Sequence, residues 1–207
     1  MKSHKNYEIE IKLRVPDPAA LKQKVARLGA RRLRRVHEYN ILYDTERRDL
    51  FRRGRLLRLR VEMKAGRRQA PPRHSNRHLP GLLTYKGPAA TESRYKVRQE
   101  VEVPVRDSAA IEPVMQALGL RPWFRYEKFR TTYRLPRLRD LHIEFDETPV
   151  GAFLELEGAP SAIDQTARLL GYCPKDFITA SYWDLYVQER RRRGKPARNM
   201  LFTRRKK

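Results

Sequence analysis

Hydrophobic and charged residues alternate along most of the chain. In residues 7–15, apolar side chains stand at positions 9, 11 and 13, and charged ones at positions 8, 10, 12 and 14. A period of two residues is typical of a β-strand with one apolar face. The pattern predicts eight strands in all, at residues 7–15, 36–43, 55–63, 82–86, 95–103, 123–135, 140–147 and 152–158.

Helices are expected between these strands. Asp17 can cap a helix that runs to residue 28, and Asp107 or Ser108 can cap one that runs to residue 118. A third is expected from about residue 161 to the glycine at 171, and a fourth over residues 179–193. The first three each have a capping residue in front and a Leu-Gly pair at the end, which are helix start and stop signals.

Four pairs of carboxylates lie two residues apart within these strands, so both members of a pair point to the same face. Any one pair could simply lie on a solvated face. Basic residues follow the same spacing, however, and the opposite faces of the strands are apolar and can be covered by the helices. The carboxylate pairs are Glu8 with Glu10, Glu100 with Glu102, Glu144 with Asp146, and Glu155 with Glu157.

Closing the strands into a barrel would turn the charged face into a lumen. A barrel of about eight strands is wide enough for side chains or one small ligand. The predicted fold is therefore α+β, an eight-stranded antiparallel β-barrel, or tunnel, with helices packed outside. Clustered carboxylates need a hard cation such as Mg²⁺ or Mn²⁺, and arginine and lysine bind phosphates. A pure RNA-binding surface fits less well, because carboxylates would repel the RNA backbone.

Composition agrees with a globular protein that binds polyanions. Hydrophobic residues make up 40% of the 207, and the formal net charge is +23. Such a charge attracts nucleotides, polyphosphate, RNA or acidic membranes without choosing among them. The single cysteine, Cys173, and the absence of a long apolar run predict a cytoplasmic protein without a membrane segment.

At this point the residues resemble a known family. The motif Glu8-Ile9-Glu10-Ile11-Lys12 is similar to the ExExK signature of the CYTH domain, whose family is that of the triphosphate tunnel metalloenzymes. This family includes class IV adenylyl cyclases, thiamine triphosphatases and inorganic triphosphatases. Further matches follow in order, at residues 43–45, 57–60, 84–86, 98–102, 128–133, 146 and 153–157.

The resemblance implies a role for each residue of the charged face. Glu8, Glu10 and Lys12 would be catalytic. Phosphates would be held by Lys12 together with Arg58, Arg60, Lys86, Arg98, Lys128 and Arg130. One or two Mg²⁺ or Mn²⁺ ions would be served by Glu8, Glu10, Asp146, Glu155 and Glu157, with Glu100 and Glu102 helping with the metal or organising the basic residues.

Residues 1–186 are expected to form the tunnel domain, with a basic loop at 64–81, and residues 187–207 a basic helical or disordered tail. The substrate is expected to be tripolyphosphate, ATP or thiamine triphosphate, and the tail could contact a polyanion. We favour triphosphate hydrolysis slightly over cyclisation of ATP to cyclic AMP and pyrophosphate. A polyphosphate- or RNA-binding module without catalysis is the third reading. The sequence leaves the oligomeric state open, a homodimer included.

Overall fold

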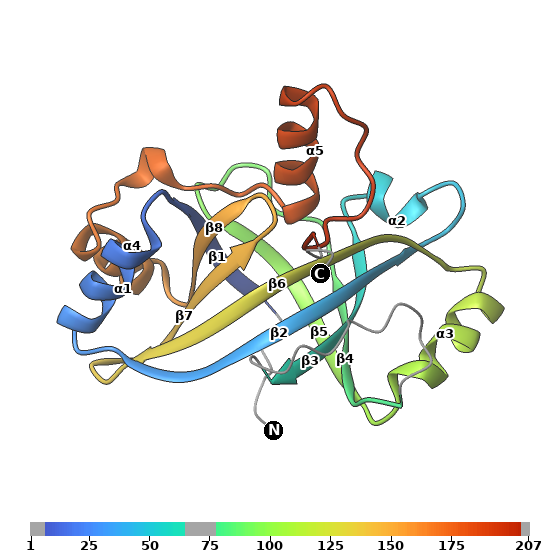
Figure 1. Cartoon of the computed structure of the whole chain (residues 1–207), viewed down its shortest axis with the longest axis horizontal. Helices are drawn as coiled ribbons and strands as arrows, with labels where there is room; N and C mark the ends of the chain where they lie inside the picture. Colours follow the sequence, from blue (N-terminus) through green and yellow to red (C-terminus); the bar gives the residue numbers. More distant parts are fainter. Residues whose placement is uncertain (1–6, 65–77, 204–207) are drawn as a thin grey trace.

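The computed structural model of the chain describes residues 7–64 and 78–203. In this part of the chain, eight antiparallel strands close into a barrel in the order β1-β5-β4-β3-β2-β6-β7-β8 (Figure 1). The strands are β1 (Tyr7–Val15), β2 (Arg31–Asp44), β3 (Leu56–Lys64), β4 (Gly81–Lys86), β5 (Lys96–Val105), β6 (Arg121–Leu135), β7 (Leu138–Thr148) and β8 (Gly151–Glu157). The predicted eight-stranded antiparallel barrel is confirmed.

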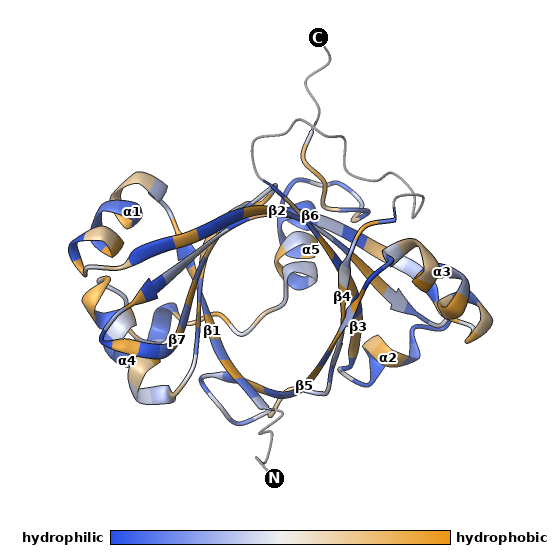
Figure 2. Ribbon diagram, turned by 90° about the horizontal axis from the view of Figure 1, so that it is seen from below, coloured by the Kyte–Doolittle hydropathy of each residue, from blue (hydrophilic) through white to orange (hydrophobic). Residues whose placement is uncertain are grey.

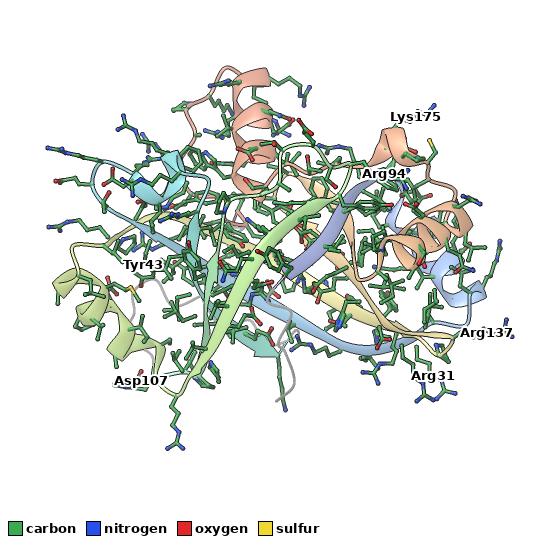
Figure 3. All side chains as sticks on the ribbon, turned by 180° about the vertical axis from the view of Figure 1, so that it is seen from behind. Arg31, Tyr43, Arg94, Asp107, Arg137 and Lys175 are labelled. Atoms are coloured by element: carbon green, nitrogen blue, oxygen red, sulfur yellow. The ribbon has the colours of Figure 1, made fainter. Side chains whose placement is uncertain are left out.

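Strand β2 is longer than the alternating pattern predicted. It was expected to begin at residue 36, but it begins at Arg31, which pairs with Arg134 of β6. Residues 31–35 contain four arginines and one leucine and show no apolar face. The backbone hydrogen bonds of the neighbouring strand, rather than burial of side chains, therefore extend β2. Figure 3 shows Arg31 and Arg137 at the same end of the molecule, where β2 starts and β6 turns into β7.

The helices lie outside the barrel, as predicted. They are α1 (Pro18–Arg27), α2 (Asp49–Arg52), α3 (Ser108–Ala117), α4 (Pro160–Leu169) and α5 (Tyr182–Arg192), with a 3₁₀ turn at Pro174–Asp176. Asp17 and Asp107 cap α1 and α3 through their carboxylates. The capping residue expected before α4 is absent: Ala159 stands at its N-cap, and Pro160 opens the helix. None of these helices, in the described part of the chain, has the length and apolar character needed to cross a membrane.

Helix α2 and the 3₁₀ turn were not predicted. The backbone nitrogens of Leu50 and Phe51, at the start of α2, each donate to the carboxylate of Asp44 at 2.9 Å. A helix of four residues is too short to show a period of 3.6 residues in the sequence. A buried carboxylate at the end of β2 thus organises a helix that the hydrophobic pattern could not reveal.

Two apolar clusters pack the helices on the outside of the barrel (Figure 2). Helices α1 and α4 cover the side formed by β1, β7 and β8, where Ile11, Phe145 and Ile163 are fully buried. Helix α3 covers β2 and β3 through Met115, and Tyr43 lies on this side (Figure 3). On these two sides the helices bury the apolar face of the strands, so the charged face is left to the inside.

Helix α5 lies across one end of the barrel and appears within the ring of strands in Figure 2. Its Tyr182, Leu185 and Tyr186 pack against apolar residues at this end of the lumen. The following segment returns to β6, where Met200 is 1% exposed and accepts a hydrogen bond from the backbone nitrogen of Glu127 at 3.0 Å. The boundary expected after residue 186 falls inside α5, and residues 65–77 of the expected basic loop lie outside the described residues.

Candidate active site in the barrel lumen

A cavity of about 340 Å³ occupies the barrel lumen. Its wall is built by the alternating charged face of the strands, because Glu8, Glu10 and Lys12 of β1 point inward while their apolar neighbours face the helices. All of the predicted site residues except Asp146 line this cavity. They are Glu8, Glu10, Lys12, Arg58, Arg60, Lys86, Arg98, Glu100, Glu102, Lys128, Arg130, Glu155 and Glu157.

Buried ion pairs line the lumen where β6, β7, β8 and β1 adjoin. Lys12 Nζ lies 2.7 Å from Glu155, which stands opposite it on β8. Arg130 of β6 contacts both Glu155 and Glu144. Burial acts to raise the pKa of Glu155, but Lys12 and Arg130 outweigh it and hold that pKa well below its usual range. These charges are therefore paired within the chain itself.

Asp146 is fully buried behind the cavity wall and is surrounded by donors of the chain itself. Its carboxylate accepts from Lys128 Nζ at 2.8 Å and from Arg130 Nη2 at 2.6 Å. The hydroxyl of Tyr182, on α5, donates to it at 2.6 Å. We therefore interpret Asp146 as the support that positions two basic side chains, whereas the predicted contact with a metal ion stays a prediction.

The end of the cavity where Glu157 lies carries an excess of negative charge. Burial, followed by the charges of Glu8 and Glu144, raises the pKa of Glu157 to about 8. Burial and the neighbouring Glu10 raise the pKa of Glu8 to about 7, although Lys86 Nζ lies 2.6 Å from its carboxylate. Both carboxylates are thus harder to ionise than a free glutamate, and a nearby cation would favour their ionised forms.

Glu10 lies next along the same face but behaves in the opposite way. Burial acts to raise its pKa, yet Lys12 and Lys96 bring it down to about 2. Burial in turn lowers the pKa of Lys96 to about 8. The ExExK segment therefore holds one carboxylate that is firmly ionised and one that titrates near neutral pH.

Glu38, Lys96, Glu144 and Tyr182 belong to the site but were not among the predicted residues. Glu38 is 0% exposed and lies 3.4–3.6 Å from Arg60, Lys128 and Arg130. Its place on the inward face of β2 could have been found from the alternation, since Asn40 shares that face. Tyr182 gave no such signal, because only the docking of α5 brings the start of this helix to the lumen.

The carboxylates at the Glu157 end are suited to a divalent cation that takes its other ligands from a substrate. Mg²⁺ is usually bound by one or two carboxylates plus phosphate oxygens and water. In residues 7–64 and 78–203, no three acidic, histidine or cysteine side chains converge closely enough to hold a metal ion by themselves. Burial and neighbouring carboxylates nonetheless raise the pKa of Glu8 and Glu157, so an added cation would lower the cost of ionising these two oxygen donors. We therefore expect a metal site whose remaining ligands are phosphate oxygens of the substrate.

Comparison with known proteins agrees with this arrangement. Residues 6–182 match the sequence model of the CYTH domain. The chain belongs to the CYTH domain family. This confirms the resemblance seen in the ExExK segment and in the ordered motifs after it.

Proteins from several organisms resemble this chain in sequence or in fold. A protein of Methanocaldococcus jannaschii, named as a candidate adenylate cyclase, is 26% identical over 164 residues, which cover 79% of this chain and 83% of that protein. A Pyrococcus horikoshii structure has a TM-score of 0.70 at 26% identity, covering 88% of this chain and 99% of that one. A Hippeastrum structure, described as a candidate adenylyl cyclase with a dominant triphosphatase activity, has a TM-score of 0.57 at 20% identity, covering 92% and 97%.

Proposed function

We propose that this CYTH protein hydrolyses a triphosphate that is bound in the barrel lumen together with Mg²⁺ or Mn²⁺. The observation that supports this most strongly is the division of charge within one cavity. Lys12, Lys128 and Arg130 are almost fully buried in its middle, while Glu8 and Glu157 crowd one end. A metal–triphosphate complex carries the complementary charges, with negative phosphates for the first group and a cation for the second.

The basic side chains are suited to exchange their present partners for phosphate oxygens. Arg58 lies 3.9 Å from Glu102, and its Nη2 donates to Thr84 Oγ1 at 3.2 Å. Lys86 bridges Glu8 and Glu100 at 2.6 and 3.1 Å. Fixed cations in a lumen shielded from water interact strongly with the charge that develops on a leaving diphosphate. They would therefore stabilise the transition state once phosphate oxygens have replaced their present partners.

Glu8 and Glu157 would hold the divalent ion, with Glu10 beside them. When bound, this ion would polarise the phosphate oxygens and help to activate the attacking water. In hydrolysis, the water oxygen forms a bond to the terminal phosphorus while the bond from that phosphorus to the bridging oxygen breaks, and one proton of the water passes to the leaving diphosphate. Lys12 and Lys128 would neutralise the diphosphate that leaves.

Adenylyl cyclase activity is the second candidate, supported by the name of the M. jannaschii relative. Here the ribose 3′-hydroxyl of ATP, instead of water, would attack the α-phosphorus. The products would be cyclic AMP and pyrophosphate. The same cations would stabilise the leaving group. A module that binds polyphosphate or RNA without catalysis is the third candidate, and the basic tail motivates it.

Product analysis with purified protein tests all three. ATP, tripolyphosphate and thiamine triphosphate are offered separately with Mg²⁺ and with Mn²⁺, and the Glu157→Gln variant is the control. Orthophosphate that depends on the metal and on Glu157 would support hydrolysis, and cyclic AMP with pyrophosphate would support the cyclase. If no substrate gave a metal-dependent product while Glu157→Gln bound polyphosphate as well as the wild type, the binding module would be the better description.

A further inference from the structure

The net positive charge of the chain does not lie in the barrel lumen. The side chains that line the cavity include ten basic and nine acidic ones, so their formal charges nearly cancel. The whole chain, however, has a formal net charge of +23. Almost all of this excess is therefore outside the cavity, where a triphosphate bound in the lumen does not use it. Surfaces that gather such charge attract polyanions.

Arginines gather at the end of the barrel where β2 starts and β6 turns into β7. Residues 31–35 and 134–140 together hold seven arginines, one aspartate and no lysine. The two segments are neighbours, because Arg31 pairs with Arg134 across β2 and β6. Figure 3 shows Arg31 and Arg137 extending away from the body of the protein at this end. The term arginine cluster is used below for Arg31, Arg32, Arg134, Arg137 and Arg139.

No carboxylate of the chain neutralises the arginine cluster. Arg34 and Arg35, from the same segment of β2, do pair with glutamates. Among the residues that the structure describes, by contrast, none forms an ion pair or a side-chain hydrogen bond with a guanidinium of the cluster. All five side chains are exposed. Their positive charge is therefore available to a partner.

The pairing of β2 with β6 places two of these charges opposite each other. Arg31 and Arg134 are cross-strand partners, and like charges in such positions destabilise a sheet. Between Arg32 and Arg34 the register then skips Leu33, whose side chain is 52% exposed. Opposed arginines and an exposed leucine both disfavour the free protein. An anion bound between the arginines would offset their repulsion.

We infer that the arginine cluster binds the phosphate backbone of a single-stranded nucleic acid. Arginine binds phosphate bidentately, and its planar guanidinium also stacks on bases, whereas lysine acts as a point charge. Segments with seven arginines and no lysine suit a ligand that offers both groups, and single strands leave their bases free to stack. Leu33 adds one apolar contact, which is too little for insertion into a membrane. This surface does not depend on the proposed hydrolysis.

Fluorescence anisotropy with a labelled oligonucleotide tests the arginine cluster. The probe is a single-stranded RNA of about 20 nucleotides with a 5′-hydroxyl group, so that it offers no triphosphate to the lumen. The variant carries Arg31→Gln together with Arg137→Gln. Each phosphate contact on a single strand contributes about 0.7 to the slope of log K against log salt concentration. Losing two contacts should therefore reduce this slope by about 1.4 and weaken binding about tenfold at 0.15 M salt.

Arg106→Gln with Arg121→Gln is the matched control, because both arginines are exposed and the net charge changes equally. Arg121 pairs with Asp44 at the other end of β2, roughly 40 Å from Arg31 by the rise of a strand. We expect this variant, and the lumen variant Lys12→Gln, to bind the RNA within about twofold of the wild type. Equal losses in both double variants would mean that net charge alone binds RNA, and no loss in either would place the binding elsewhere. Either result would overturn the inference.

Other ligands and the active site are separated by two further measurements. If Arg31→Gln with Arg137→Gln lost binding to anionic lipid vesicles or to long-chain polyphosphate but kept RNA binding, the inference would be wrong. Turnover of tripolyphosphate should match the wild type, and a loss as large as that of RNA binding would assign these arginines to the triphosphate site instead. If the wild type bound RNA through the cluster but turned over no triphosphate, the proposed function would fall and the inference would stand. The variant should unfold at no lower temperature than the wild type, because it removes one of two opposed charges.

Discussion

Replacing Asp146 by asparagine would remove the charge at the centre of the buried network while keeping the shape of the side chain. The carboxylate is 0% exposed and accepts from Lys128 Nζ at 2.8 Å and from Arg130 Nη2 at 2.6 Å. Removing one partner of a buried ion pair costs about 3–5 kcal/mol. Glu38 and Glu155 would still face the two cations, so we expect a loss near the lower limit, about 3 kcal/mol.

The measurement is thermal unfolding followed by circular dichroism in metal-free buffer, so that ligand binding does not contribute to stability. For a chain of this size, each kcal/mol shifts Tm by about 2–4 °C, so Asp146→Asn should lower Tm by about 6–12 °C. Glu147→Gln is the matched control. This neighbouring residue pairs with Arg35 at 2.7 Å on the surface, and such a pair contributes at most about 1 kcal/mol.

Tyr182→Phe extends the same test to α5. It removes a hydrogen bond to a buried carboxylate, which is worth about 1.5–3 kcal/mol. The double variant with Asp146→Asn should lose less than the sum, because both changes remove the same contact. If Asp146→Asn lowered Tm by less than about 2 °C and abolished only metal-dependent activity, Asp146 would be a metal ligand rather than a support, and our reasoning would be refuted.

Three further predictions concern other parts of the site. Burial and Glu8 raise the pKa of Glu157 to about 8, well above its unfolded value, so the contribution of this residue to stability is complete at acid pH and is lost as pH rises toward 8. In metal-free protein, Glu157→Gln should therefore raise Tm at pH 8.5 and leave it nearly unchanged at pH 5. Equal Tm shifts at the two pH values would argue against a raised pKa for Glu157. Met200→Ala should lower the free energy of unfolding, measured with urea, by about 2–5 kcal/mol, while Leu201→Ala, at a residue that is 39% exposed, should have a small effect. Similar losses for the two variants would mean that Met200 does not anchor the segment after α5. Lys12→Gln should reduce kcat by about a hundredfold or more, and a variant with wild-type turnover would remove Lys12 from the proposed mechanism.

Much of the fold could be read from the strands because a barrel repeats one simple rule along its whole length. Each strand must turn apolar residues toward the helices and the rest toward the lumen, so alternation at residues 7–15 already separates Ile11 from Lys12. Where this rule did not apply, the sequence predicted a strand that was too short or missed a helix. The arginine-rich start of β2 and the four-residue α2 depend on backbone pairing and on Asp44, which leave no periodic trace.

The sequence by itself determined which residues share the charged face, since the period of a strand is a local property. Only the tertiary structure decided what each charge does there. Asp146 is held by donors of the chain while Glu157 is left among other carboxylates, and the two look alike in the sequence. Closure of the barrel and docking of α5 set these distances, and the strength of buried charges depends on distance and burial rather than on residue type.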